Sequence, residues 1–321
     1  MDILVTGGAG YIGSHMVKML AQQGYSVVTL DDLSTGYEDA VRYGEFVLGG
    51  TGDEQLLEDL FSSQDFSAVM HFAAFSLVGE SVENPEKYYR NNFCHTGKLL
   101  EAMRRHRVEH FIFSSTAAVF GEPAYLPIDE RHSINPLNSY GRSKSMVEGM
   151  LADFGRSYGL RSVALRYFNA AGADPEGELG ERHQPETHLI PLVLQAASGK
   201  RKNISVFGTD YDTEDGTCMR DYIHVYDLCM AHLLALKYLL DGGETRVFNL
   251  GNGEGYSVRQ VIESVERVTG RSIEVVEADR RPGDPARLVA DSTAAEEVLG
   301  WQRRYPQLEQ IVRHAWAWEN R

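Results

Sequence analysis

Short runs of apolar residues recur along the first half of the chain, and segments with a helical pattern separate them. A run that is apolar throughout, without alternation, is typical of a strand that is covered on both faces. Such runs occur at residues 2–6, 25–30, 45–48, 68–72, 110–115, 161–168 and 246–250. The order of strands and helices predicts an α/β fold with a doubly wound parallel sheet and helices on each face.

Two of the intervening segments carry clear helix signals. "IGSHMVKMLAQQG" ends at Gly24, and glycine commonly follows the last turn of a helix. "EKYYRNNFCHTGKLLEAMRRH" is amphipathic and ends in basic residues, which interact favourably with the C-terminal end of a helix. We therefore expect helices over 12–24 and 86–106.

The pattern changes after Asn169. Residues 170–186 are rich in Gly, Pro and Glu without a period, which predicts a loop that leaves the sheet. Beyond it, the helical stretches "RQVIESVERVTG" and "PQLEQIVRHAWAWEN" and the strand "SIEVVEA" indicate a smaller C-terminal α/β domain. "DYIHVYDLCMAHLLALKYLL" followed by "RVFNL" is typical of a helix and a strand that rejoin the first sheet.

These observations divide the chain into two expected domains. The first comprises residues 1–168, with about 221–250 returning to it, and the second comprises residues 169–220 and 251–321. The whole chain has 321 residues, which is long enough to bury a full core.

Charge and hydropathy narrow the expected partners. Lys and Arg total 31 and Asp and Glu total 46, so the net charge is −15. Such an acidic surface argues against nucleic acid or an anionic membrane as a general partner. Residues 1–6 meet glycine at once, and no apolar stretch approaches the roughly 20 residues of a membrane span. We expect a cytoplasmic protein with no membrane partner.

The three cysteines do not suggest a metal site. Cys94, Cys218 and Cys229 are odd in number and form no Cys-x-x-Cys or Cys/His cluster. Neither a disulfide framework nor a zinc site follows from this spacing. We therefore expect reduced thiols and no bound metal.

A glycine-rich stretch marks a candidate cofactor site. "TGGAGYIGSH" follows the first strand and opens the first helix, with Gly7, Gly10 and Gly13 in a Gly-x-x-Gly-x-x-Gly pattern. Glycines here allow a tight turn and the close approach of a pyrophosphate to the helix N-terminus. Asp31, eighteen residues after Gly13, is positioned to accept hydrogen bonds from ribose hydroxyls, which favours NAD over NADP. A solvated turn would also explain Asp31 and Asp32.

The stretch "SYGRSK" holds a candidate proton-transfer pair. Tyr140 and Lys144 are four residues apart, so both side chains emerge from one face of a helix. A nearby ammonium favours the ionised form of a phenol and would bring it toward the range of a general base. A half-buried aromatic residue beside a solvated lysine would give the same pattern.

With the glycine loop, Tyr140, Lys144 and "SST" at the end of the fifth strand, the chain resembles the extended short-chain dehydrogenase/reductase family. The resemblance implies a Rossmann-type NAD-binding domain and a smaller C-terminal substrate domain. Within that family the chain is similar to the UDP-glucose 4-epimerases along nearly its whole length. The stretches that carry this similarity are "HFAAFSLVGESVENP", "YYRNN", "FSSTAAVFGEP", "LRYFNAAGA", "VFGTDYDTEDGTCMRDYIHVYDL" and "RRPGDPARLVADS".

The resemblance implies reversible C4 epimerisation of UDP-galactose and UDP-glucose. In such enzymes tightly bound NAD takes hydride from C4 while the tyrosine takes the 4-hydroxyl proton, and the 4-keto sugar turns over before hydride returns to its other face. Tyr140 would be the base, Lys144 would lower its pKa and hold the nicotinamide ribose, and Thr116 would hydrogen-bond the reacting hydroxyl.

Two alternatives within reach of this resemblance are weaker. The related nucleotide-sugar 4,6-dehydratases carry an Asp-Glu pair directly after this threonine, whereas the chain has Ala117 and Ala118, which cannot transfer protons. A decarboxylase is disfavoured for the same reason. A non-catalytic NAD-binding sensor would not need Thr116, Tyr140 and Lys144 together.

The resemblance also implies further contacts of the cofactor and the substrate. Asn169 would meet the nucleotide diphosphate sugar, residues 205–207 would flank uracil, and Arg220 with Arg281 and Asp284 would hold the diphosphate and the uridine ribose. The residues assigned to NAD are Gly7, Gly10, Tyr11, Ile12, Gly13, Asp31, Asp32, Leu33, Ser34, Thr35, Gly36, Phe72, Ala73, Ala74, Ser76, Asn91, Thr116, Tyr140, Lys144 and Phe168. Those assigned to the substrate are Ser76, Thr116, Tyr140, Asn169, His188, Leu189, Ser205, Val206, Phe207, Arg220, Arg281, Asp284 and Leu288.

Four positions depart from the pattern of the family. Ser76 stands where many relatives have lysine, and His188 where others have asparagine. Gly50 replaces an aspartate that meets adenine, and Asp53 could substitute only if the loop shifts. Leu288 falls where a bulky tyrosine excludes N-acetyl groups. Because leucine is smaller, we expect some activity on UDP-N-acetylgalactosamine, and an enzyme acting mainly on UDP-N-acetylhexosamines is an alternative.

The family also suggests an assembly. Two long helices near 86–106 and 140–158 correspond to helices that pair across a two-fold axis into a four-helix bundle. The resemblance therefore implies a homodimer.

Overall fold

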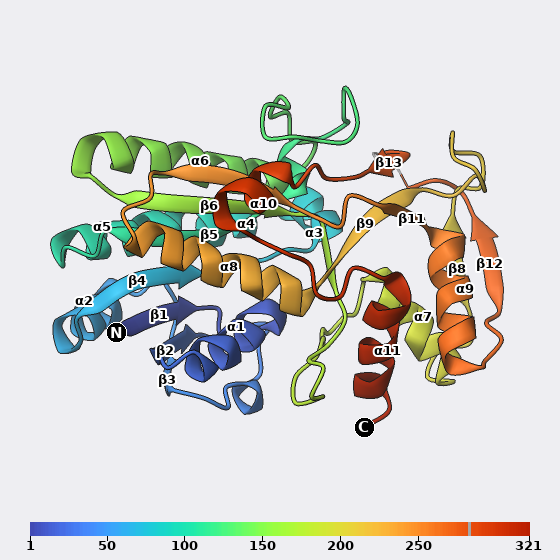
Figure 1. Ribbon diagram of the computed structural model, residues 1–321, viewed down its shortest axis with the longest axis horizontal. Coiled ribbons are helices and arrows are strands. Elements are labelled where there is room, and N and C mark those ends of the chain that lie inside the picture. Colours follow the sequence, from blue (N-terminus) through green and yellow to red (C-terminus); the bar gives the residue numbers. More distant parts are fainter. Residues whose placement is uncertain (282–283) are drawn as a thin grey trace.

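A seven-stranded sheet runs through the larger part of the protein (Figure 1), in a computed structural model that describes residues 1–281 and 284–321. Every neighbouring pair of strands is parallel, which confirms the predicted doubly wound sheet. Pro282 and Gly283, within the stretch "RRPGDPARLVADS", lie outside the described residues. In spatial order the strands are β10 (Arg246–Leu250), β6 (Arg161–Tyr167), β5 (His110–Thr116), β4 (Phe66–His71), β1 (Asp2–Thr6), β2 (Ser26–Asp31) and β3 (Glu45–Leu48).

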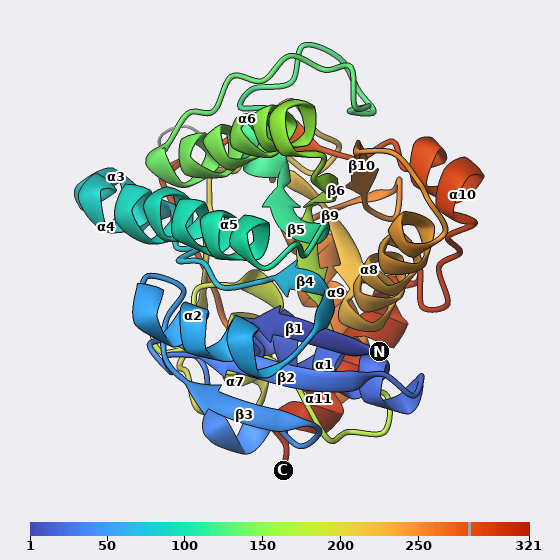
Figure 2. The ribbon, with the colours of Figure 1, turned by 90° about the vertical axis from the view of Figure 1, so that its left-hand side faces the viewer.

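Helices cover both faces of this sheet. Successive side chains of a strand point to opposite faces, and here the side chains on both faces are apolar. Ile3 and Val5 of β1 pack in the core on one face of the sheet, whereas Leu4 packs in the core on the other face. All three residues are fully buried. Figure 2 shows the two helical layers. The helices are α1 (Tyr11–Gln22), α8 (Val225–Leu240) and α10 (Thr293–Leu299) on one face, and α2 (Glu54–Ser63), α5 (Thr96–Arg105) and α6 (Ser139–Tyr158) on the other.

The predicted helix over 86–106 is an almost continuous helical segment with an irregular middle. After α3 (Val78–Glu83), Asn84 caps α4 (Pro85–Tyr88) by accepting a hydrogen bond from the Lys87 backbone. Residues 89–95 then follow a π-helical path that leads into α5. Among the described residues, no helix is both long enough and apolar enough to cross a membrane.

The C-terminal part is a smaller α/β unit, as expected. Its core lies between helices and two short sheets. The four-stranded sheet contains β7 (Asn169–Ala171), β9 (Met219–His224), β11 (Gly255–Ser257) and β13 (Arg287–Leu288); the two-stranded sheet contains β8 (Ile204–Phe207) and β12 (Val275–Ala278). The helices are α7 (Leu189–Ala197), α9 (Val258–Thr269) and α11 (Leu308–Glu319).

Two element predictions were wrong. Residues 170–171, expected to begin a loop, belong to strand β7. Residues 221–224, expected to begin a helix, are the end of strand β9 in the four-stranded sheet. The helix α8 begins only at Val225, because His224 acts as its cap and accepts a hydrogen bond from the Tyr226 backbone at 3.0 Å. The following strand β10 does join the large sheet, beside β6. The division into two domains remains a prediction.

Candidate active site

A cleft of about 1180 Å³ lies at the carboxyl ends of several strands of the large sheet. Ligands of doubly wound sheets bind at this edge, where loops leave the strands. Residues that follow β1, β2, β4 and β5 line one wall, and residues of the C-terminal part line the other. The cleft therefore brings together segments that are far apart in the sequence.

The glycine loop is shaped for close backbone contacts. Gly7 has a φ of 74°, and a Cβ atom there would come within 2.4 Å of the Ala73 backbone nitrogen. A Cβ on Gly13 would come within 2.1 Å of the Gly7 carbonyl oxygen. Gly10 precedes α1, whose N-terminus has no side-chain cap and faces the cleft. This arrangement fits the pyrophosphate of a dinucleotide such as NAD.

Asp31, which is expected to bind the ribose of the cofactor, also holds the backbone of the glycine loop. Its carboxylate accepts hydrogen bonds from the backbone of Ala9 at 3.0 Å and of Leu33 at 2.8 Å. Burial raises the pKa of Asp31, although both hydrogen bonds oppose the rise. The carboxylate thus ties β2 to the glycine loop, and each oxygen retains a second lone pair for a ribose hydroxyl. Asp32 is exposed at the rim of the cleft.

The start of α6 brings Tyr140 to the end of β5. Asn138 caps the helix by accepting a hydrogen bond from the Gly141 backbone at 2.9 Å. A Cβ on Gly141 would come within 2.3 Å of the Ala118 carbonyl oxygen, so glycine allows the helix to approach the strand end. One turn later, the Lys144 ammonium donates to the Ser114 carbonyl at 2.8 Å. Tyr140, Lys144 and Thr116 are all buried against the cleft.

Burial dominates the electrostatics of these groups. It raises the pKa of Tyr140, and a hydrogen bond with Thr116 opposes that rise. It lowers the pKa of Lys144 to about 7, against the attraction of Glu148. Lys144 therefore carries only part of its charge near neutral pH, so the expected lowering of the Tyr140 pKa by Lys144 stays a prediction.

The opposite wall presents arginines. The Arg220 guanidinium donates to Asp284 at 3.1 Å and to the Pro285 carbonyl at 2.9 Å. Leu288 pairs with Arg220 in the register of β13 and β9, so the two residues lie side by side. The Arg281 guanidinium lies 4.0 Å from the centre of the Phe207 ring. The Asn169 amide donates to the Asp221 carbonyl at 3.3 Å.

Most of the expected site residues line this one cleft, from Gly7 to Leu288. Phe207 lies outside its lining but packs against Arg281, and the Val206 side chain is fully buried in the core. Gly50 lines the cleft, whereas Asp53 caps α2 and does not line it. The expected residues that do not line the cleft are Leu33, Gly36, Leu189, Ser205, Val206 and Phe207.

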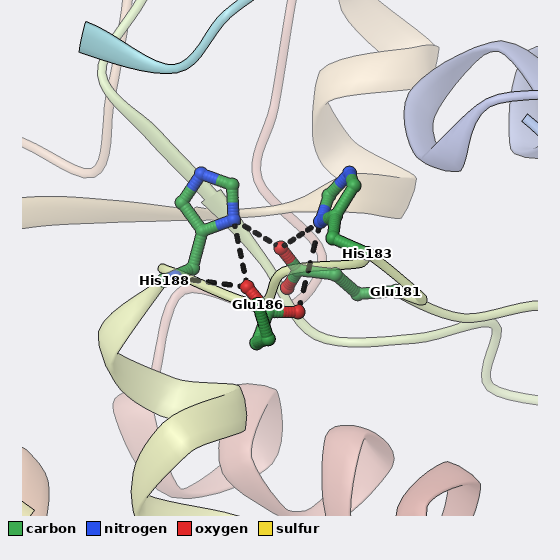
Figure 3. Close-up of side chains that lie close together, drawn as sticks. All are labelled: Glu181, His183, Glu186 and His188. Carbon is green, nitrogen blue, oxygen red and sulfur yellow. Dashed lines mark hydrogen bonds and ion pairs between the residues drawn. The ribbon is translucent and has the colours of Figure 1, made fainter. Parts of the chain in front are cut away.

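Sequence reasoning missed two groups of residues. The buried side chain of Asn92 bonds both backbone groups of Phe75, at 2.9 and 3.0 Å, and so fixes the loop after β4. Glu181, His183 and Glu186 gather around His188 on the C-terminal side (Figure 3). The spacing His-x-x-Glu-x-His was the signal available for the second group.

The histidines of that group are influenced by the two glutamates. Burial alone would lower their pKa values, but Glu181 and Glu186 raise the pKa of His183 to about 9 and that of His188 to about 10. The His188 imidazole lies 2.6 Å from Glu181 and 3.3 Å from Glu186.

The chain is similar over nearly its whole length to proteins of one family. A profile of the NAD dependent epimerase/dehydratase family matches residues 3–251. The UDP-glucose 4-epimerase of Halalkalibacterium halodurans is 52% identical over 318 residues, covering 99% of this chain and 95% of that protein. The crystal structure of UDP-glucose 4-epimerase from Brucella ovis in complex with NAD is 52% identical with a TM-score of 0.96, covering 98% of this chain and 97% of that one. The UDP-Glc/GlcNAc 4-epimerase of Campylobacter jejuni is 43% identical with a TM-score of 0.87, covering 99% of each chain.

Proposed function

The chain belongs to the NAD dependent epimerase/dehydratase family, and from this membership we propose that it interconverts UDP-galactose and UDP-glucose by epimerisation at C4, with NAD as the cofactor. The observation that carries the proposal is the convergence of Thr116, Tyr140 and Lys144 on the cleft that also contains the glycine loop. A sheet edge with a dinucleotide loop alone would support many reactions.

In the proposed mechanism the protein moves one proton and holds the sugar. NAD, when bound, supplies a hydride acceptor that later returns the hydride. Tyr140 accepts the proton of the 4-hydroxyl and gives it back after the 4-keto sugar has turned over. The Thr116 hydroxyl forms a hydrogen bond with the reacting 4-hydroxyl oxygen. Lys144, when it is protonated, stabilises the Tyr140 phenolate. Ala117 and Ala118 offer no acid or base for an elimination, which favours epimerisation over dehydration.

The arginine wall is proposed to bind the UDP part of the substrate. Arginine donors form a planar fork that matches phosphate oxygens. Arg220 and Arg281 supply two such groups in the cleft, and Asp284 holds Arg220 in place. The roles of Asn169, His188 and residues 205–207 in substrate binding follow the same assignment and remain proposals.

A second candidate function is epimerisation of N-acetylated UDP-hexoses. Leu288 lies in the cleft beside Arg220 and is smaller than tyrosine, which leaves room at this point. The similar protein from Campylobacter jejuni is named for both UDP-Glc and GlcNAc.

We also propose a homodimer formed through α5 and α6. These helices pack together on one face of the sheet, and α6 exposes Met146 and Tyr158. Light scattering at micromolar concentration should give twice the chain mass, and a monomer mass would contradict the proposal. A cytoplasmic location stays a prediction.

Turnover of UDP-galactose without added NAD tests the proposed function. The purified protein should form UDP-glucose and contain NAD that is released on denaturation. A folded, NAD-containing protein that converts no UDP-hexose would contradict the proposal and favour the sensor alternative.

A further inference from the structure

Four side chains from residues 181–188 converge on one point in the lining of the cleft (Figure 3). Glu181, His183, Glu186 and His188 each offer one potential ligand atom, and these four atoms lie within 4.8 Å of one another. Glu181 Oε1 lies 2.6 Å from His188 Nδ1 and 3.2 Å from His183 Nδ1. Both imidazoles therefore present the same ring nitrogen to the same carboxylate oxygen.

The two carboxylates of this group are buried. Only 5% of the Glu181 side chain and 7% of the Glu186 side chain are exposed. Within the part of the chain that the structure describes, neither Glu181 Oε1 nor His183 Nδ1 forms a contact with hydrogen-bond geometry, although both atoms are buried. Such atoms are costly without a partner. These atoms are close enough for ion pairs, and their convergence on one point is also the arrangement that a shared cation would require.

Glu186 is held so that one oxygen remains for that partner. Its Oε1 atom accepts hydrogen bonds from the backbone of Thr187 at 2.7 Å and of His188 at 2.8 Å. Its Oε2 atom faces His183 Nδ1 at 3.6 Å. The carboxylate is thus fixed by the backbone before it meets any ligand.

We propose that Glu181, His183, Glu186 and His188 form a binding site for a divalent transition-metal ion, with Zn²⁺ as the best match. Imidazole nitrogen and carboxylate oxygen are both ligands that Zn²⁺ accepts. A tetrahedral site with bonds of about 2.0–2.1 Å separates its ligand atoms by about 3.3 Å. The four nitrogen–oxygen distances in the group are 2.6, 3.2, 3.3 and 3.6 Å, on either side of that value, and the four ligand atoms all lie within 4.8 Å of one another. Two carboxylates and two neutral imidazoles also balance the charge of the ion.

A site with four protein ligands is closed, so the ion is structural and takes no part in the chemical step. Its role is to fix residues 181–188 as a wall of the cleft and as the segment that leads into α7. Neighbouring contacts support this role: the Trp318 indole donates to the Glu181 carbonyl at 3.0 Å, and the Tyr11 ring packs edge-on against His183. Because His188 uses Nδ1 for the ion, any contact with the substrate uses its other ring atoms.

The competing arrangement is a pair of imidazolium ions neutralised by the two glutamates. Protons and the metal ion then compete for the same nitrogens, so metal affinity must fall as the pH falls. The inference is independent of the proposed function, because metal binding is measured without any sugar substrate.

The test is metal binding by the purified, NAD-containing protein after treatment with a chelator. Calorimetry at pH 8 should show one equivalent of Zn²⁺ bound, with weaker binding at pH 6 and none for Mg²⁺. His183→Gln and Glu186→Gln should each weaken Zn²⁺ binding by at least about 100-fold, since even outer-shell partners of a metal ligand are worth about 10–100-fold. His106→Gln is the matched control, because it removes a histidine–glutamate pair, 2.9 Å from Glu58, outside the cleft.

The inference would be overturned if the unaltered protein bound no Zn²⁺ at pH 8, or if the control and His183→Gln bound Zn²⁺ with equal affinity. If the variants fail to fold, a second measurement on the unaltered protein tests the site. The visible spectrum of the Co²⁺-loaded unaltered protein should show the intense bands of a four-coordinate ion, and a weak six-coordinate spectrum would contradict the site. NMR signals of two protonated imidazoles at pH 8 in the presence of Zn²⁺ would establish the ion-pair arrangement instead.

Discussion

The two walls of the cleft are held in place by different kinds of interaction. The glycine-loop wall, formed by residues from the loops after β1, β2 and β4, stands on strands whose apolar side chains are buried on both faces. The arginine wall, formed by Arg220, Arg281, Asp284 and Leu288, stands on short strands tied together by buried charged and polar groups.

Asp221 shows how the arginine wall is tied. Its fully buried carboxylate accepts hydrogen bonds from the backbone of Asn252 at 2.6 Å, Gly253 at 3.0 Å and Ala290 at 3.1 Å. These amides belong to segments after β10 and β13, so one side chain fixes the neighbourhood of Arg220 and Leu288. Apolar packing together with the Asp31 hydrogen bonds therefore positions the first wall, and the buried Asp221 carboxylate positions the second. Substitutions should affect the two walls in different ways.

The largest effect on activity should come from a substitution of Tyr140, which lies between the two walls of the cleft. Tyr140→Phe removes the proposed proton acceptor but keeps the ring and its packing. We expect kcat for UDP-galactose to fall by about 10²- to 10⁴-fold, with NAD still bound. Tyr158→Phe is the matched control, because Tyr158 is an exposed residue at the other end of α6. A Tyr140→Phe enzyme with ordinary kcat would rule out the proposed base.

In the glycine-loop wall, the addition of a single methyl group at Gly13 should lower both stability and NAD binding. Gly13→Ala places a Cβ 2.1 Å from the Gly7 carbonyl, so the loop must shift. We expect a loss of about 1–3 kcal/mol in the free energy of unfolding and a protein that purifies without NAD. Gly149→Ala, with open space around the added atom, should be neutral or stabilising by up to about 1 kcal/mol. Full NAD content in Gly13→Ala would contradict the assigned role of the loop.

The arginine wall should respond to charge and to pH instead. Asp221→Asn keeps the shape of the side chain but turns one acceptor oxygen toward the amides into a donor. We expect the free energy of unfolding to fall by about 1–3 kcal/mol and KM for UDP-galactose to rise, with NAD content unchanged. Asp153→Asn, an exposed change on α6, is the control and should have little effect.

The pH dependence sharpens this expectation. Burial raises the pKa of Asp221 from 3.8 to about 6. Between these pH values the folded state binds more protons at this site than the unfolded state, so the contribution of Asp221 to stability falls as the pH rises from about 4 to about 6. Urea unfolding at several pH values should show that slope, and Asp221→Asn should lack it. Identical slopes in both proteins would contradict the assignment.

The same contrast explains what the sequence could and could not predict. The strands of the large sheet, the glycine loop and the pair Tyr140 and Lys144 depend on local patterns: apolar runs, a glycine spacing and a helical repeat of four. These features were predicted to within a few residues. The start of α8 was not, because residues 221–224 form a strand through pairing with distant partners, which no local pattern records.

The missed site features have a related cause. Asp221 gains its importance from three amides that are far away in the sequence, and Asn92 from its contact with the loop at Phe75. The Lys144 pKa depends on depth of burial, which the spacing from Tyr140 does not indicate. The cluster around Glu181 had a local spacing, but only the fold shows that its four side chains turn inward.

The smallest expected effect concerns the point where the walls meet the sugar. Leu288 lies in the cleft beside Arg220 and also packs on a small apolar cluster that includes Phe168. If it leaves space for an N-acetyl group, Leu288→Tyr should lower kcat/KM for UDP-N-acetylgalactosamine by about tenfold and leave UDP-galactose nearly unchanged. Leu288→Met, which conserves volume, should preserve the ratio of the two values. A ratio that stays constant in Leu288→Tyr would make Leu288 a packing residue only, and the choice of sugar would then depend on other parts of the arginine wall.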